Sequence, residues 1–209
     1  MKITWLGHSC FMVEKDDYVI VLDPYSDGSV PGLAPVHLQA NKVYCSHEHG
    51  DHNARGNVER VEKERRSPFH HTEISTYHDE VKGAKRGPNK IHVLESDGIR
   101  VVHLGDLGCD LTEMDRRLIG RPDVLMIPVG GYYTIDAAKA RQIASTLNPK
   151  VILPMHYRSE RFGFDVIGEL SEFTDYYDNV VVTEGSSFAY PNDFLKEGTV
   201  LVLTPEMAE

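Results

Sequence analysis

Three histidines and one aspartate fall within six residues near the end of the first quarter of the chain. The segment reads Cys45-Ser46-His47-Glu48-His49-Gly50-Asp51-His52. In an extended stretch alternate side chains point the same way, so His47 and His49 can reach one point. After the turn that Gly50 permits, Asp51 and His52 can reach a second point nearby. Imidazole and carboxylate groups suit borderline divalent cations, so the segment predicts a metal site with room for two ions.

The overall composition is that of a globular chain. Its 209 residues, 41% hydrophobic and 26% charged, suit a single domain spanning residues 1–209. The longest apolar runs, such as Tyr18–Leu22 and Val124–Val129, are far shorter than the roughly 18 residues of a membrane span. We therefore expect no membrane partner.

Charge and cysteine usage indicate the environment of the chain. The net charge of −10 makes it a poor partner for nucleic acid. Its three cysteines form no Cys-x-x-Cys pair, and the N-terminal residues show no secretory signal. A reducing, cytoplasmic location is the expectation. The oligomeric state is open, a homo-oligomer included.

Strand-like runs dominate the first half, and helix–strand alternation follows. The expected strands are Lys2–Leu6, Cys10–Lys15, Tyr18–Leu22, Lys42–Cys45, Ile91–Glu95, Ile99–Leu104, Asp123–Val129, Lys150–Pro154, Asn179–Val182, Ser187–Tyr190 and Val200–Leu203. The expected helices are residues 53–64, Leu111–Ile119, Asp136–Leu147 and Val166–Tyr177. This order predicts two sheets with helices packed outside, in an α/β or α+β fold.

The pattern His-x-His-x-Asp-His after a strand resembles the metallo-β-lactamase superfamily. Other segments resemble later motifs of that superfamily in the same order: Trp5-Leu6-Gly7-His8-Ser9-Cys10-Phe11, Leu22-Asp23-Pro24, Leu104-Gly105-Asp106-Leu107-Gly108, Pro128-Val129-Gly130-Gly131 and Pro154-Met155-His156-Tyr157. The resemblance is to the small metal-dependent hydrolases that include the ascorbate-6-phosphate lactonases. It implies a four-layer αββα sandwich.

The same resemblance implies a set of ligands. His47 and His49 match a first metal site, Asp51, His52 and His156 match a second, and Asp106 matches a carboxylate that bridges both. The first site needs one more histidine, which in this superfamily precedes the hairpin ending in the bridging aspartate. His78 has that placement, whereas His103 lies on the strand that leads into Asp106. We favour His78 over His103, and over the weaker competitors His70, His71 and His92.

Four further residues are expected to contact the substrate. His8, Lys85, Arg86 and Tyr157 are the candidates, with Lys85 and Arg86 as an anion clamp on a loop after His78. His8 could instead orient a ligand. Asp23 is expected beside the ligands or in a turn, not as a ligand.

These features predict a metal-dependent hydrolase in which a hydroxide bound by two metal ions attacks a small ester, lactone or phosphodiester, with Asp51 and Asp106 as catalytic groups. Zinc is the first choice of metal, with manganese, iron and nickel as alternatives. Two divalent ions, less Asp51, Asp106 and hydroxide, leave a charge of about +1, which favours an anionic small-molecule substrate. The alternatives are a nuclease, an iron-dependent redox enzyme and a non-catalytic metal-binding protein.

Overall fold

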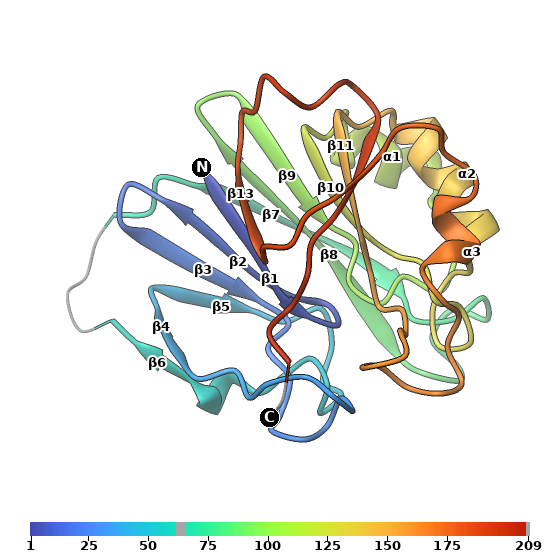
Figure 1. Ribbon diagram of the computed structural model, residues 1–209, viewed down its shortest axis with the longest axis horizontal. Helices are drawn as coiled ribbons and strands as arrows, with labels where there is room; N and C mark the ends of the chain where they lie inside the picture. Colours follow the sequence, from blue (N-terminus) through green and yellow to red (C-terminus); the bar gives the residue numbers. More distant parts are fainter. Residues whose placement is uncertain (62–65, 208–209) are drawn as a thin grey trace.

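The computed structural model describes residues 1–61 and 66–207, and two facing β-sheets form its centre (Figure 1). The first sheet has the order β13-β1-β2-β3-β5. Its strands are β1 (Lys2–Gly7), β2 (Cys10–Lys15), β3 (Tyr18–Leu22), β5 (Lys42–Tyr44) and β13 (Ser187–Ala189). Asp16 and Asp17 both have positive φ, so the two-residue turn between β2 and β3 forms where the sequence predicts it.

The second sheet has seven strands in the order β12-β14-β11-β10-β9-β8-β7. They are β7 (His70–Tyr77), β8 (Pro88–Ser96), β9 (Ile99–His103), β10 (Val124–Pro128), β11 (Val151–Met155), β12 (Val180–Val182) and β14 (Thr199–Val202). Strands β9 to β12 and β14 run parallel, whereas the hairpins β7–β8 and β8–β9 are antiparallel. Strand β7 therefore points the same way as β9.

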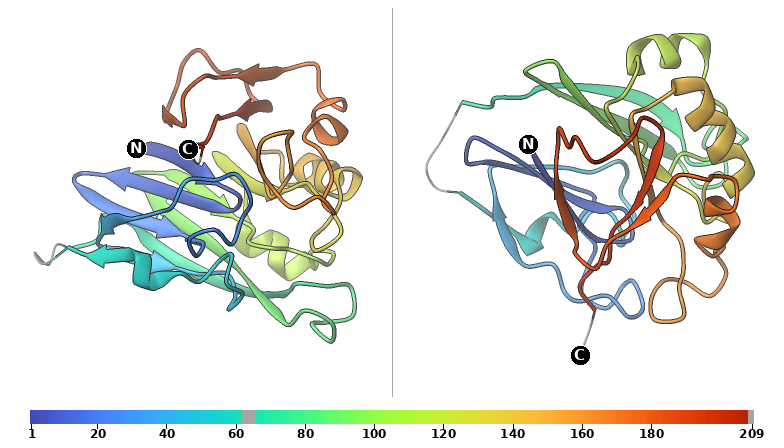
Figure 2. Two further views of the ribbon diagram at one scale, coloured as in Figure 1. Left: turned by 60° about the horizontal axis from the view of Figure 1, so that its bottom comes forward. Right: turned by 45° about the horizontal axis from the view of Figure 1, so that its top comes forward.

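Helices cover the second sheet on the face away from β1–β3 (Figures 1 and 2). They are α1 (Glu113–Ile119), α2 (Ala137–Leu147) and the short α3 (Ser171–Thr174). Thr112 starts α1 with a capping box, and the Asp136 carboxylate accepts the Lys139 N–H at the start of α2.

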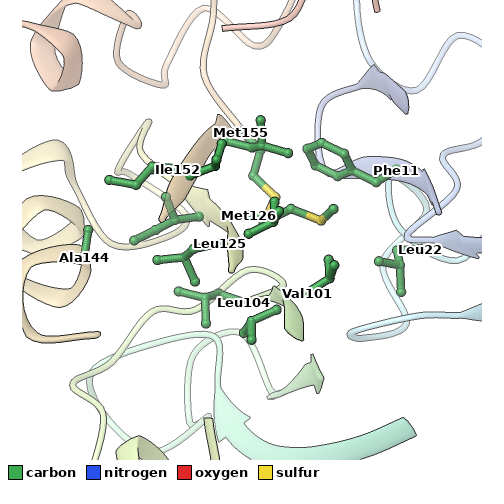
Figure 3. Packing of buried hydrophobic residues seen from close by; sticks show 14 of the residues in the cluster. Phe11, Leu22, Val101, Leu104, Leu125, Met126, Ala144, Ile152 and Met155 are labelled. Carbon is green, nitrogen blue, oxygen red and sulfur yellow. The ribbon is translucent and has the colours of Figure 1, made fainter. Parts of the chain in front are cut away.

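Alternating side chains of the first sheet supply two hydrophobic clusters. Phe11 and Leu22 face the second sheet, where Val101 and Met126 meet them, and Leu125 lies on the helix side towards Ala144 of α2 (Figure 3). The intervening side chains, such as Cys10 and Val21, pack under residues 25–40 on the outer face. This pattern is the period-2 signature of strands buried on both faces.

The α/β sandwich is confirmed, but two expected helices differ. Residues 53–64 were expected to be helical, yet Arg55–Asn57 forms a 3₁₀ turn and β6 (Val58–Arg60) pairs with β4 (Leu38–Ala40). Gly56 and Asn57 are poor helix formers, and Val58 is buried as a strand residue. The end of that helix, residues 62–64, lies outside the described residues.

The helix expected over Val166–Tyr177 shortens to α3. Gly168 donates a hydrogen bond to the Gly130 carbonyl at 2.6 Å and Glu169 forms an isolated bridge with Arg158, so a turn and an irregular connection replace the first part of the expected helix. Strand β7 was not expected at all. Among residues 1–61 and 66–207, no helix is long and apolar enough to cross a lipid bilayer.

Candidate metal centre

The predicted ligands meet because four strands end at one edge of the sandwich. His78 directly follows β7, Asp106 follows β9 by three residues, and His156 directly follows β11. These three strands run in the same direction, so their carboxyl ends share one edge of the second sheet. The loop 45–52 after β5 brings the remaining ligands to the same place from the first sheet.

Two groups of donor atoms contain the predicted ligands at this edge, and a third, fully buried group joins Asp23 to His47 and His52. The first consists of His47, His49 and His78, whose ring nitrogens lie within 4.8 Å of one another. The second consists of His8, Asp51, His52 and His156, whose ligand atoms also lie within 4.8 Å of one another. The predicted ligands thus separate into the two predicted sets, and His8 joins the second.

Asp106 stands between the two groups. Its Oδ2 lies 3.4 Å from Nε2 of His78, 3.1 Å from Nε2 of His52 and 3.2 Å from Nε2 of His156. A single carboxylate oxygen therefore faces donors of both groups, which is the position required of a bridging ligand.

Buried ring nitrogens test whether the centre suits a metal ion. Nε2 of His47 is buried without a hydrogen-bond partner, and Nε2 of His52 and His156 faces the Asp106 carboxylate without making a hydrogen bond of good geometry. Leaving such atoms unpaired is costly unless something else binds them. Imidazole nitrogens and carboxylates clustered this closely are a ligand set for divalent cations such as Zn²⁺. The residues present therefore fit metal binding.

A second set of contacts fixes the ring orientations. The Asp23 carboxylate accepts hydrogen bonds from Ser46 Oγ at 2.5 Å and from Nδ1 of His52 at 2.9 Å. Ser46 Oγ in turn lies 2.9 Å from Nδ1 of His47 and can accept its proton. Both rings then carry the proton on Nδ1 and leave Nε2 free for a metal, so Asp23 lies behind the ligands, as expected.

Asp106 is also fixed by its surroundings. Its backbone N–H donates to Oδ1 of Asn89 at 2.9 Å, and Ser9 Oγ lies 3.4 Å from its Oδ1. Gly105, with φ +58°, has no room for a side chain: a Cβ would lie 2.4 Å from Oδ1 of Asn89. The glycine lets the chain turn tightly against β8, which aims Oδ2 at the histidines.

Electrostatics favour the metal-binding protonation state of most of the ligands, with His52 as the exception. Burial, with His52 nearby, lowers the pKa of His47 to about 3, and burial with His156 lowers that of His8 to about 4. Burial opposes ionisation of Asp106, but His156 and His52 outweigh it and hold the pKa of Asp106 well below its usual range. Burial disfavours charged His52, yet Asp106, Asp23 and Asp51 raise its pKa well above the ordinary value. Without a cation, the three carboxylates therefore favour a second proton on the His52 ring, and a metal ion would have to displace the proton on Nε2.

His103 does not join the centre. Its Nε2 donates to the Ser9 carbonyl at 2.8 Å and its Nδ1 accepts the Gly105 N–H at 3.0 Å, so both ring nitrogens are occupied. His78 therefore has the position expected of the third histidine. Of the weaker competitors, His71 and His92 contact each other at 3.1 Å, and His70 is exposed.

A cavity of about 340 Å³ opens onto the centre and is lined in part by His49, Asp51, His78, Asp106 and His156. Such a volume suits a small molecule. Arg86 and Tyr133 also line it, with the Arg86 guanidinium carbon 5.5 Å from the centroid of the Tyr133 ring.

Three of the expected substrate contacts need correction. Lys85 is exposed, pairs with Glu80 and does not line the cavity, because its side chain leaves the loop on the solvent side. Tyr157 is buried and packs on Trp5 at 5.4 Å between ring centroids, because the positive φ of His156 turns the chain back into the core. His8 is buried behind the cavity, with its Nε2 3.2 Å from Oδ2 of Asp51.

Sequence reasoning missed Asn89, Ser46 and Phe164. Asn89 supports Asp106 from 17 residues away, which no local spacing reveals. Ser46 lies inside the histidine segment, and its position before His47 was the available signal. Phe164 lines the cavity from the loop after β11 and had no signal.

Comparison with known proteins gives the family. Residues 2–156 match the family described as the beta-lactamase superfamily domain. A protein of Archaeoglobus fulgidus named a metal-dependent hydrolase is 31% identical over 200 residues, covering 76% of this chain and 84% of the relative. A metal-dependent hydrolase of Thermoplasma acidophilum is 27% identical over 203 residues, covering 80% and 86%.

A solved structure agrees. A Thermotoga maritima protein, assigned as a zinc-dependent hydrolase of the metallo-β-lactamase superfamily, is 33% identical with a TM-score of 0.77 over 97% of each chain. The resemblance to this superfamily is thereby confirmed. The chain belongs to the beta-lactamase superfamily domain family and is a metal-dependent hydrolase of the metallo-β-lactamase superfamily.

Proposed function

We propose that the centre holds two divalent metal ions, zinc in both positions, and that the protein hydrolyses a small ester, lactone or phosphodiester. The observation that carries this proposal is the position of Asp106. Its Oδ2 lies within 3.4 Å of Nε2 of His78 in the first group and within 3.2 Å of Nε2 of His52 and His156 in the second.

The first ion would be held by His47, His49 and His78, and the second by Asp51, His52 and His156. Asp106 would bind both. When bound, the two ions supply an activated water nucleophile and offset the negative charge that develops on the substrate oxygen.

The chain itself contributes orientation and charge. Asp23 and Ser46 hold the protons of His52 and His47 on Nδ1, so that Nε2 of each ring faces the centre. His8 contacts the Asp51 carboxylate from the buried side and limits how far it can turn. Asp51 and Asp106 place two negative charges where mutual repulsion between cations would otherwise be greatest.

The size of the cavity supports a small-molecule substrate. About 340 Å³ accommodates a molecule of metabolite size, and the chain's net charge of −10 disfavours a nucleic-acid backbone. The lactonase resemblance belongs to the same proposal, since a phosphorylated lactone is one such substrate.

The test is to remove metals from the purified protein, restore zinc, manganese, iron or nickel singly, and measure bound metal together with hydrolysis. The panel is neutral and anionic aryl esters, lactones, bis(p-nitrophenyl) phosphate and oligonucleotides. We expect two zinc ions per chain and turnover that returns with the metal. One ion per chain at saturation would overturn the dinuclear proposal. Two ions without turnover of any compound would favour the non-catalytic alternative, and cleavage of oligonucleotides alone would favour the nuclease.

A further inference from the structure

Arg86 lines the cavity as a cation that has no acidic partner among residues 1–61 and 66–207. It is half-buried, lines the cavity, and has its guanidinium carbon 5.5 Å from the centroid of the Tyr133 ring. Among the ion pairs of the described residues, none involves Arg86. The neighbouring Lys85, by contrast, is exposed and pairs with Glu80. An unpaired guanidinium facing a cavity can bind an anion without first giving up a carboxylate.

The loop that carries Arg86 is rigidly built around Asp79. The buried Asp79 carboxylate accepts four backbone N–H groups: those of Val81 at 2.9 Å, Gly83 at 2.8 Å, Lys85 at 2.9 Å and Arg86 at 2.7 Å. The N–H of His78 also donates to the Gly87 carbonyl at 3.1 Å. Both ends of the loop are therefore tied together, and the backbone of Arg86 is fixed relative to the metal-site residue His78.

An aromatic wall stands between Arg86 and the second group. Tyr133 comes from the loop after β10 and Phe164 from the loop after β11, and both line the cavity. Their ring centroids are 6.2 Å apart with an interplanar angle of 75°, and the Tyr133 ring lies 6.5 Å from that of His156. A flat apolar group can rest against this wall while an attached anion reaches Arg86.

We propose that Arg86 is the specificity-determining residue, and that the substrate is a small molecule in which an oxyanion, carboxylate or phosphate, is attached to a flat apolar group. The guanidinium binds the oxyanion through paired N–H donors, while Tyr133 and Phe164 contact the apolar part. The Tyr133 face keeps the guanidinium in place before the substrate arrives. The proposal rests on the proposed function for the reaction itself, but not for the binding.

Binding of non-hydrolysable probes tests the proposal. The probes are benzoate, phenylphosphonate and neutral benzamide, measured by calorimetry with the zinc-loaded protein and its variants. Arg86→Ala should weaken binding of the two anions about ten- to a hundredfold and leave benzamide within about twofold. Arg86→Lys should recover part of the loss. Lys85→Ala is the matched control from the same loop and should change nothing beyond about twofold.

The aromatic wall gives a separate readout. Tyr133→Ala should weaken benzoate and benzamide together, because it removes contact with the ring of both. Benzoate and phenylphosphonate differ only in the anion, so a preference between them identifies which oxyanion the site favours.

Contrary outcomes are clear. Equal anion affinity in wild type and Arg86→Ala would mean that the anions bind the metals alone and would overturn the proposal, as would an equal loss in Lys85→Ala. If instead the proposed function is wrong, no ester, lactone or phosphodiester is cleaved, while binding of benzoate still depends on Arg86.

Discussion

The loop 45–52 and the hairpin β8–β9 both bury histidines, yet they use them differently. In the loop, Nε2 of His47 and His52 is left without a hydrogen-bond partner and faces other donors. In the hairpin, His103 bonds the main chain through both ring nitrogens. Burial therefore does not distinguish a metal ligand from a structural histidine. An unpaired ring nitrogen does not distinguish them either, because Nε2 of His92 in the hairpin is also buried without a partner. The difference is that several histidine and carboxylate donors converge on the loop histidines.

The largest effect should come from Asp106, on which the loop histidines converge. Asp106→Asn keeps the shape but removes the charge, so it should bridge two cations poorly and no longer offset their repulsion. We expect hydrolysis to fall by at least about a hundredfold, measured as kcat/KM with the zinc-loaded protein. The control is Asp110→Asn, which removes an exposed carboxylate paired with Lys139 on the same segment.

Near wild-type turnover of Asp106→Asn with two zinc ions bound would contradict the bridging role. Loss of activity in Asp110→Asn to the same degree would indicate damage to the segment rather than to the bridge.

The hairpin side of the comparison is tested by His103→Leu. The substitution leaves the buried Gly105 N–H and the Ser9 carbonyl without partners, each worth about 1–3 kcal/mol. The free energy of unfolding should fall by about 2–6 kcal/mol, measured by urea denaturation, while zinc still saturates at two per chain. A zinc ion lost from His103→Leu at unchanged free energy of unfolding would show that His103, and not His78, is the third histidine ligand.

His78→Ala is the companion variant of His103→Leu. It should lose the zinc ion of the first group, while the free energy of unfolding of the metal-free protein changes little.

Asp23 tests whether ring orientation matters to the loop histidines. Asp23→Asn weakens the acceptor that holds His52 and Ser46, and such changes behind metal ligands typically cost ten- to a hundredfold in metal affinity. The measurement is competition for zinc against a chromophoric chelator.

Asp27→Asn is the matched control for Asp23→Asn, because Asp27 contacts Nε2 of His37 at 2.8 Å on the exposed surface, away from the centre. Equal zinc affinity in the Asp23 and Asp27 variants would show that orientation by Asp23 is unimportant.

The sequence could predict the centre because its ligands sit at strand ends within short motifs. His47, His49, Asp51 and His52 fall in one segment, and their convergence needs only an extended chain and a turn at Gly50. His78 could be placed because the hairpin β8–β9 separates it from Asp106. Most strands were located well, since alternating apolar residues mark them.

The sequence could not predict the direction in which several side chains near the centre point. Whether Tyr157 faces the cavity or the core depends on the positive φ of His156. The side chains of Lys85 and Arg86 point in different directions because the Asp79 carboxylate binds the backbone N–H groups of both residues and sets the shape of the loop. The helix expected at residues 53–64 failed because Val58 found a strand partner in Leu38, a tertiary contact that overrides local propensity.

The smallest expected effect is a pH dependence of stability that arises from His92, which belongs to the hairpin and not to the centre. Burial lowers the pKa of His92 to about 4, against 6.5 for an exposed histidine. A depressed histidine pKa means that the unfolded chain binds the proton more readily, so stability is full above pH 6.5 and is lost as pH falls towards 4. At about pH 5 the free energy of unfolding is therefore about 2 kcal/mol lower than at pH 8.

The test uses His92→Gln in the metal-free protein. Between pH 8 and pH 5 its free energy of unfolding, measured by urea denaturation, should fall by about 2 kcal/mol less than that of wild type. His70→Gln, on the exposed side of β7, should follow the wild-type curve. Parallel curves for His92→Gln and wild type would show that the acid sensitivity of the fold arises elsewhere. The next group to examine would then be the carboxylate of Asp23: its burial opposes ionisation, but the contacts with His52, His103 and Ser46 together outweigh burial and lower its pKa to about 2.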